Sequence, residues 1–332
     1  MVWPVAELLI VLLMAKNDRI TVSESRALSI IRVFAMMLIL SCHIAQFYGL
    51  RIAFLLNVGV QLFFFMSGFL YGKLDVPESP FVFYKKRFVK VYLPFVLWTF
   101  IVVVIYSIFG LYHVTIKQIL LYILNLQWFA TPIVGLNHLW FLTVLMICYL
   151  VTPWVKRALT KRSFFIFISV FLACCFVEFL FVKKFYGLFA WLTLYVFGLI
   201  FGSFYSEKFS NIVLASSAVV LIVLGFGFNI ELLESVESKE YAVWTKWFLG
   251  VFLFSVLFRC LSKISIPKPK FDLVSHLDKL SYDIYLIHHP LILGPLSVMY
   301  ISRYSYLNII IVLLSAYLLS LLFHLVYTRV LS

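Results

Sequence analysis

The chain has 332 residues, of which 64% are apolar and only 12% are charged. In soluble domains about a quarter of the residues are charged, so this composition excludes an ordinary soluble protein and indicates an integral membrane protein. The formal net charge is +13, but the basic residues fall in short loops between apolar segments rather than in one patch. That pattern is typical of membrane topology and argues against a nucleic-acid partner.

The N-terminal residues 1–25 are expected to form a cytoplasmic segment. Residues 5–14 are apolar but too short to cross a bilayer, and Glu7 interrupts them. They also lack the basic start and the small-residue cleavage site of a signal peptide. Because the sequence from Met14 onward is typical of a protein start, we expect residues 1–13 to be an extension of the gene model.

Apolar segments of membrane-crossing length then follow one another through residues 26–330. We therefore expect an all-α polytopic protein, a single bundle of about ten transmembrane helices. The stretch 116–129 is amphipathic and too short to cross, so we expect it to lie in the interface or to re-enter the membrane. The expected spans are 27–48, 52–71, 90–109, 136–153, 164–182, 186–204, 211–229, 242–260, 280–300 and 306–328.

Lys and Arg are concentrated in alternate loops of this arrangement. The loop after the second span, for example, holds Lys85, Lys86 and Arg87. Since cytoplasmic loops carry the excess of basic residues, this asymmetry places both termini in the cytoplasm. The acidic loop at residues 231–240 then lies outside.

Arg32 and His43 are eleven residues apart in the first span. On a helix this spacing returns them to within roughly 20° of one face and separates them by roughly 16 Å along the axis. A cation at membrane depth is expensive and usually faces protein or water. The pair is either a snorkelling arginine with a structurally bonded histidine or part of a polar path along the helix. The spacing alone does not choose between these interpretations.

The span at 280–300 is also rich in polar residues. Tyr285 precedes His288 by three positions and His289 by four, so it is expected to neighbour both on the helix surface. Pro290 is predicted to break this helix and to free carbonyl groups near the histidines. Two adjacent histidines beside a tyrosine in a membrane helix favour a functional interpretation over packing alone.

Three other segments carry polar or small residues that are candidates for a functional or a packing role. His138 opens the fourth span, where an interfacial role and a functional one both stay open. Arg87 and Lys90 lie in the basic segment before the third span, which is explained either by topology or by a phosphate site. In the second span, Gly68 and its small neighbours favour close helix contact. The sequence contains no P-loop and no Rossmann glycine motif, and its cysteines have no metal-site spacing.

Together these segments resemble the acyltransferase-3 family of membrane acyltransferases, from about Arg26 to the last span. Many members have two arginines three apart in the basic segment, whereas this chain has Lys90 at the second position. Lysine lacks the bidentate fork of arginine. The segments that carry the resemblance are Arg32 with His43, 59–68, 86–90, 138–142 and 280–288.

The resemblance implies transfer of an acyl group, usually acetyl, from cytosolic acyl-CoA to a hydroxyl of a cell-surface glycan or its lipid-linked precursor. It also implies the bacterial plasma membrane as location, with membrane lipid, the glycan acceptor and glycan-biosynthesis proteins as partners. No metal is expected. The alternative is a transporter or flippase of a lipid-linked or acylated sugar, which the lack of an evident inverted repeat disfavours.

In the enzyme interpretation, His43 is the candidate general base for the acceptor hydroxyl, because imidazole titrates near neutral pH. Arg32 is the candidate for holding a phosphate or the thioester carbonyl of the donor. His288 either binds the acceptor or supports His43, and direct transfer and an acyl-histidine intermediate both stay open. The candidate residues for binding acyl-CoA or the acceptor are Arg87, Lys90, His138, Tyr285 and His288.

Overall fold

The computed structural model describes residues 20–75, 79–129, 131–159, 188–227, 239–264 and 272–331. Within these ranges all regular secondary structure is helical, which confirms the all-α prediction for the described part. The segment before residue 20, the expected span at 164–182 and most of the acidic loop lie outside the described residues. The chain divides into two compact units, Met1–Ala35 with Val58–Pro80 and Cys148–Lys268, and Met36–Asn57 with Phe81–Ile147 and Pro269–Ser332.

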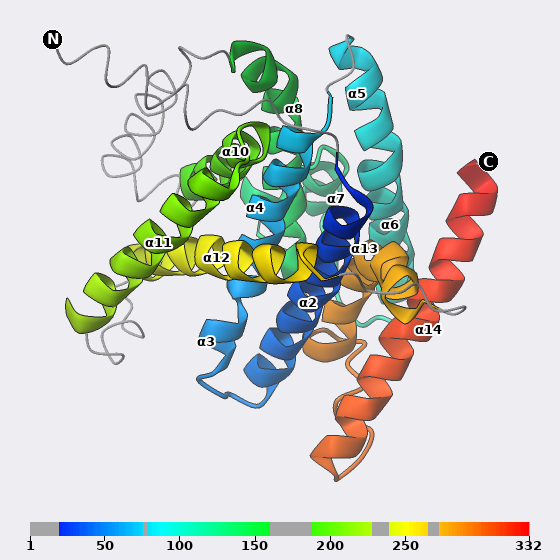
Figure 1. Cartoon of the computed structure of the whole chain (residues 1–332). Helices are drawn as coiled ribbons and strands as arrows, with labels where there is room; N and C mark the ends of the chain where they lie inside the picture. Colours follow the sequence, from blue (N-terminus) through cyan, green and yellow to red (C-terminus); the bar gives the residue numbers. More distant parts are fainter. Residues whose placement is uncertain are drawn as a thin grey trace, which may run out of the picture. The chain divides into compact units, whose positions relative to one another are not determined.

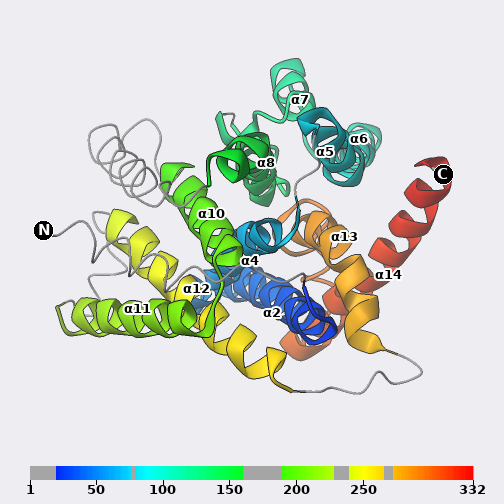
Figure 2. The ribbon, with the colours of Figure 1, turned by 45° about the horizontal axis from the view of Figure 1, so that its top comes forward.

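In the first unit, α4 (Val58–Lys73) and α10 (Leu188–Ser203) lie side by side (Figure 1 and Figure 2). Glycines make this approach possible, since a Cβ at Gly68 would stand 2.0 Å from the Tyr195 carbonyl oxygen. A Cβ at Gly198 would stand 2.2 Å from the Phe65 carbonyl oxygen. Such small residues let membrane helices pack backbone against backbone. The close helix contact predicted for Gly68 is therefore confirmed.

The same unit contains α11 (Glu207–Gly227) and α12 (Lys239–Ser262), which pack against each other, and α12 also packs against α4. The first part of α2 (Val22–Phe47) belongs here as well. Glu24 on α2 and Lys73 on α4 form an ion pair with 2.8 Å between Oε1 and Nζ, and both side chains are largely buried. The pair joins the start of the first expected span to the end of the second.

The second unit surrounds α13 (Leu273–Leu293), which packs against α14 (Ser305–Leu331), α6 (Leu93–Ile108) and the short 3-10 helix η3 (Asn137–Leu139). It also holds the later part of α2, and the first part of α8 (Trp140–Ala158). The smaller elements of this unit are α3 (Ala53–Leu56), α5 (Pro80–Arg87), the π-helical turn η1 (Phe88–Tyr92), α7 (Ile116–Ile123) and η2 (Gln127–Phe129).

Six helical stretches of the described residues are long and apolar enough to cross a membrane. Helix α10 is apolar but shorter, and α7, in the stretch expected not to cross, is a short helix that starts with a capping box. The membrane character of the chain is thereby supported, while the count of ten spans and the cytoplasmic termini stay predictions. The six stretches are Val22–Phe47, Ala53–Lys73, Pro80–Ile108, Asn137–Ala158, Trp244–Ser262 and Ser305–Arg329.

The prediction that Pro290 breaks its helix is wrong, because α13 continues to Leu293. Proline removes the N–H that would donate to the Leu286 carbonyl oxygen, but the loss is limited to this one ladder bond and the helix ends three residues later. The carbonyls at the end of α13 find partners in the next loop. The Val298 N–H donates to the Leu291 oxygen at 3.0 Å, and the Ser297 hydroxyl donates to the Ile292 oxygen at 2.8 Å.

Candidate active site

Helix α2 carries Arg32 and His43, as the spacing predicted. The helix runs from Val22 to Phe47 and contains no proline or glycine to interrupt it. Both side chains are half-buried. Arg32 lies in the part of α2 that belongs to the first unit, and His43 lies in the part that belongs to the second.

Four histidines of the second unit meet in one place. The His43 ring lies 5.2 Å from that of His288 and 4.6 Å from that of His289, between centroids. The His138 ring lies 5.1 Å from that of His288 and stacks on that of His289 at 4.6 Å. We call these four residues the histidine cluster. The structure thus brings together three predicted site residues, His43, His138 and His288, from α2, η3 and α13.

Tyr285 fixes the position of His138 through two hydrogen bonds. Its hydroxyl donates to the His138 carbonyl oxygen at 2.6 Å, and the His138 Nε2–H donates to the Tyr285 carbonyl oxygen at 3.0 Å. Both residues are buried. This reciprocal pair holds the short η3 segment against the middle of α13, and Tyr285 lies beside the rings of His138 and His288.

Gly135 positions His289 from the loop before η3. Its carbonyl oxygen accepts a hydrogen bond from the His289 Nδ1–H at 2.9 Å. Gly135 has a φ of +83°, and an added Cβ would stand 3.1 Å from the Gly294 Cα and 2.6 Å from the Tyr106 hydroxyl. Only glycine suits both this backbone conformation and this close contact. The loop therefore lies directly against the end of α13.

The hydrogen bonds also determine which ring nitrogens carry hydrogen. Carbonyl oxygens can only accept, so His138 donates from Nε2 while His288 donates from Nδ1 to the Ile284 oxygen at 3.0 Å. In the neutral imidazoles the opposite nitrogens, His138 Nδ1 and His288 Nε2, then carry a lone pair. Both are buried and have no hydrogen-bond partner among the described residues. The cluster therefore presents proton-accepting nitrogens in a buried place.

The sequence model of the acyltransferase-3 family, described as "Acyltransferase domain", matches residues 25–329. The chain belongs to the acyltransferase-3 family. The resemblance carried by the sequence motifs is thereby confirmed, and with its membrane-type helices the protein is a membrane acyltransferase. No curated protein and no solved structure matches the chain.

The basic segment of this acyltransferase lies outside the histidine cluster but is linked to it. Arg87 ends α5, and Lys90 is exposed in the π-helical turn η1. Such turns occur frequently at functional sites. The Tyr282 hydroxyl donates to the Val91 carbonyl oxygen at 2.6 Å, and the Tyr282 ring stacks on Tyr285 with 6.5 Å between centroids. Two tyrosines of α13 thus connect the basic turn to His138.

Two residues of the site were not among the predicted candidates. The His289 ring contacts the rings of His43 and His138. Its position next to His288 in the sequence could have marked it as a candidate site residue. Gln46 accepts a hydrogen bond from the His43 Nδ1–H, with 2.7 Å between Nδ1 and Oε1. Its position three residues after His43 on a helix is a detectable signal too. Gly135, in contrast, could not be assigned to His289 without the fold.

Within the described ranges, no group of three or more His, Cys, Asp or Glu side chains has a geometry that could hold a metal ion. The cluster histidines point their N–H groups at oxygens of the chain. Catalysis without a metal stays a prediction.

Proposed function

We propose that this membrane acyltransferase moves an acyl group, expected to be acetyl, from cytosolic acyl-CoA to a hydroxyl of a cell-surface glycan or a lipid-linked sugar precursor. Its expected location is the bacterial plasma membrane, where glycan-biosynthesis proteins would supply the acceptor. The observation that carries the proposal is the histidine cluster, since it gathers proton-accepting nitrogens around His43. Family membership supports acyl transfer as the reaction.

His43 is the proposed general base. Its Nδ1–H is donated to Gln46, so in the neutral ring Nε2 has the lone pair that takes a proton. As Nε2 removes the proton from the acceptor hydroxyl, the oxygen bonds to the thioester carbonyl carbon and the carbon–sulfur bond breaks. The thiolate of CoA leaves and takes the proton from His43, which restores the base. A positioned group of this kind typically contributes 10²–10⁴-fold to the rate.

His138, Tyr285 and His288 are proposed to serve the acceptor side. Their lone-pair nitrogens, His138 Nδ1 and His288 Nε2, accept hydrogen bonds but donate none in the neutral form. A sugar offers hydroxyl donors to such nitrogens, whereas a thioester carbonyl and a phosphate offer only acceptors. This difference supports a hydroxyl group, rather than a phosphate or the thioester carbonyl, as the group that approaches these nitrogens.

Arg32, Arg87 and Lys90 are proposed to serve the donor. The CoA head carries several negative charges, and basic groups attract and hold phosphates. An arginine binds a phosphate or a carbonyl through a fixed fork, while the exposed Lys90 acts as a point charge. Arg32 follows the same helical face as His43 at roughly 16 Å along the axis.

The proposal is tested with purified protein in lipid nanodiscs, radiolabelled acetyl-CoA and cell-envelope glycan precursors. We expect label to move to a glycan hydroxyl, and mass and NMR analysis of glycans from cells with and without the gene should show one ester lost in the deletion strain. A protein that neither hydrolyses nor transfers from any acyl-CoA, and whose deletion leaves every glycan ester in place, would contradict the proposal.

A further inference from the structure

Gln46 is the hydrogen-bond partner of the proposed base. Its Oε1 lies 2.7 Å from the Nδ1 of His43, and the two residues are three positions apart near the end of α2. Residues at this spacing are neighbours on a helix surface. Gln46 is exposed and His43 is half-buried, so the glutamine is the more accessible member of this pair.

The partner of His43 differs in kind from those of the other cluster histidines. His138, His288 and His289 all donate to backbone carbonyls, which the fold holds in place. His43 donates to a side chain. The orientation of the His43 ring therefore depends on the Gln46 side chain, which a substitution can remove without altering the backbone.

We propose that Gln46 is a positioning residue that holds His43 in the reactive tautomer, with hydrogen on Nδ1 and the lone pair on Nε2. This inference rests on the proposed function of His43 as the general base. An amide oxygen can only accept, so it favours the Nδ1–H form and fixes the plane of the ring. Without this partner, a neutral imidazole is free to carry its hydrogen on either nitrogen.

The bond also acts while the proton is transferred. When Nε2 takes the acceptor proton, His43 becomes an imidazolium and still donates its Nδ1–H to Gln46. A hydrogen bond from a charged donor is roughly twice as strong as a neutral one. The amide therefore stabilises the charged form of the base more than the neutral form, which lowers the barrier. Losing an orienting partner of a functional histidine typically costs 10–100-fold, as measured for metal-bound histidines.

Two substitutions at Gln46 separate orientation from simple packing. Gln46→Leu removes the acceptor, and we expect kcat to fall roughly 10–100-fold with little change in KM. Gln46→Glu keeps an acceptor and adds a negative charge beside the imidazolium, so we expect activity to be retained and the acidic limb of the kcat–pH profile to move to higher pH. The other titratable groups around His43 are His288 and His289 of α13 and, beyond them, His138 of η3.

The control is Leu50→Glu, which places a carboxylate at an exposed position four residues after Gln46, beyond the end of α2. We expect this variant to leave both kcat and the pH profile unchanged. Wild-type kcat in Gln46→Leu would overturn the proposal, as would a Gln46→Glu variant that is as slow as Gln46→Leu and has an unmoved profile.

A measurement without turnover separates this proposal from the proposed function. Nitrogen-15 NMR of histidine-labelled protein in lipid distinguishes protonated from lone-pair ring nitrogens. We expect Nδ1 of His43 to be protonated in the wild type and partly deprotonated in Gln46→Leu, with His43→Asn used to assign the signal. A wild-type lone pair on Nδ1 would reject the role of Gln46 even in an active enzyme. Inactive protein with the expected tautomer would reject only the proposed function.

Discussion

At the scale of single residues, two ring nitrogens of the histidine cluster are among the buried polar atoms of the described residues that have no hydrogen-bond partner. A buried polar atom without a hydrogen bond lowers stability by about 1–3 kcal/mol, and His138 Nδ1 and His288 Nε2 are both of this kind within the described part of the chain. Proteins tolerate such local cost mainly at functional sites. This supports a chemical role for the cluster rather than a purely structural one.

Tyr285→Phe tests how the cluster is held. The substitution removes the donor to the His138 carbonyl oxygen and leaves that buried oxygen one partner short. We expect the free energy of unfolding in detergent to fall by about 0.5–2 kcal/mol, and transfer activity to fall because η3 loosens. Tyr300→Phe is the matched control, because Tyr300 is exposed. Equal stability and activity in both variants would show that the hydrogen bond does not position His138.

The sequence was sufficient to select His43, His138, Tyr285 and His288 as candidates, because polar residues in apolar segments are conspicuous. Their meeting in space was not predictable from spacing, since His43 and His138 belong to different helices and both contact His288 of α13. The sequence also gave no sign that the end of α13 rests against a loop glycine, a contact that depends on the positive φ of Gly135.

At the scale of helices, the contact between α4 and α10 depends on glycine. The sequence predicted this contact for α4 but did not identify the helix that packs against it. Gly68 was expected to allow close packing, but its partner could not be named, because any apolar helix offers a comparable surface. The structure assigns α10, whose Gly198 meets the backbone at Phe65. The error at Pro290 is of another kind, because α13 continues through the proline to Leu293 although one backbone donor is missing.

Gly198→Ala is expected to strain this contact. The new Cβ would stand 2.2 Å from the Phe65 carbonyl oxygen, and a backbone atom cannot move aside as a flexible side chain does. We expect the free energy of unfolding to fall by about 1–3 kcal/mol, the usual cost of overpacking. The measurement is thermal unfolding of the purified protein in detergent. Val196→Ala on the same helix, at a half-buried position, is the control, and an equal melting temperature for both variants would argue against the close packing.

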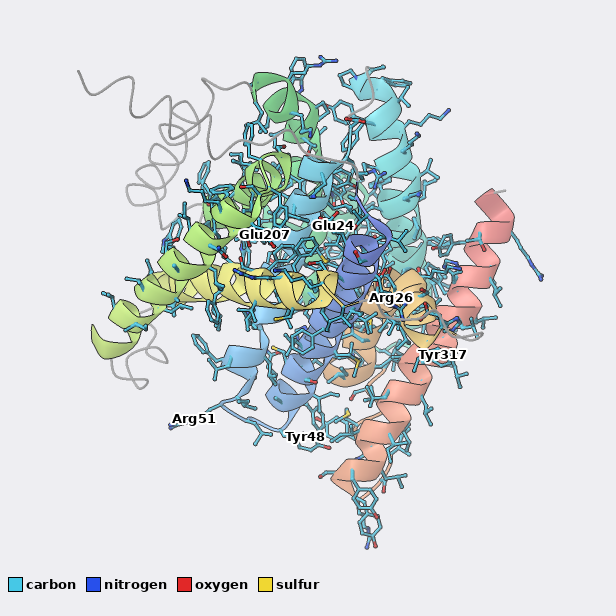
Figure 3. The ribbon with its side chains drawn as sticks, viewed as in Figure 1. Glu24, Arg26, Tyr48, Arg51, Glu207 and Tyr317 are labelled. Carbon is cyan, nitrogen blue, oxygen red and sulfur yellow. The ribbon has the colours of Figure 1, made fainter. Side chains whose placement is uncertain are left out.

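At the scale of the whole molecule, composition predicted the helical membrane protein, and the order of its motifs predicted the family that the match over residues 25–329 confirms. The ends of the spans were less predictable. Helix α13 begins at Leu273, although the apolar segment was expected to start at residue 280, because a helix continues through polar residues once packing supports it. Tyr48 lies just beyond α2 (Figure 3), and its hydroxyl donates to the Ser305 carbonyl oxygen. The two residues are 257 positions apart in the sequence, so no local sequence pattern predicts this contact.

Topology is testable with reporters fused to the C-terminus. The distribution of Lys and Arg predicts that both ends lie in the cytoplasm. A fluorescent protein fused after the last residue should therefore be fluorescent, whereas alkaline phosphatase at the same place should be inactive. The opposite pattern would reject the predicted orientation and, with it, the assignment of the basic segment around Arg87 to the side from which acyl-CoA arrives.

The role of His43 is decided by the rate at which labelled acyl groups reach the acceptor in wild-type protein and in His43→Ala. His276→Ala is the matched control, because His276 lies on α13 with Tyr317 as its partner rather than in the cluster. We predict that His43→Ala lowers the rate by at least about 10²-fold while membrane insertion and the melting temperature stay normal, and that His276→Ala keeps the wild-type rate. A His43→Ala protein that transfers acyl groups at the wild-type rate would contradict the assignment of His43 as the base.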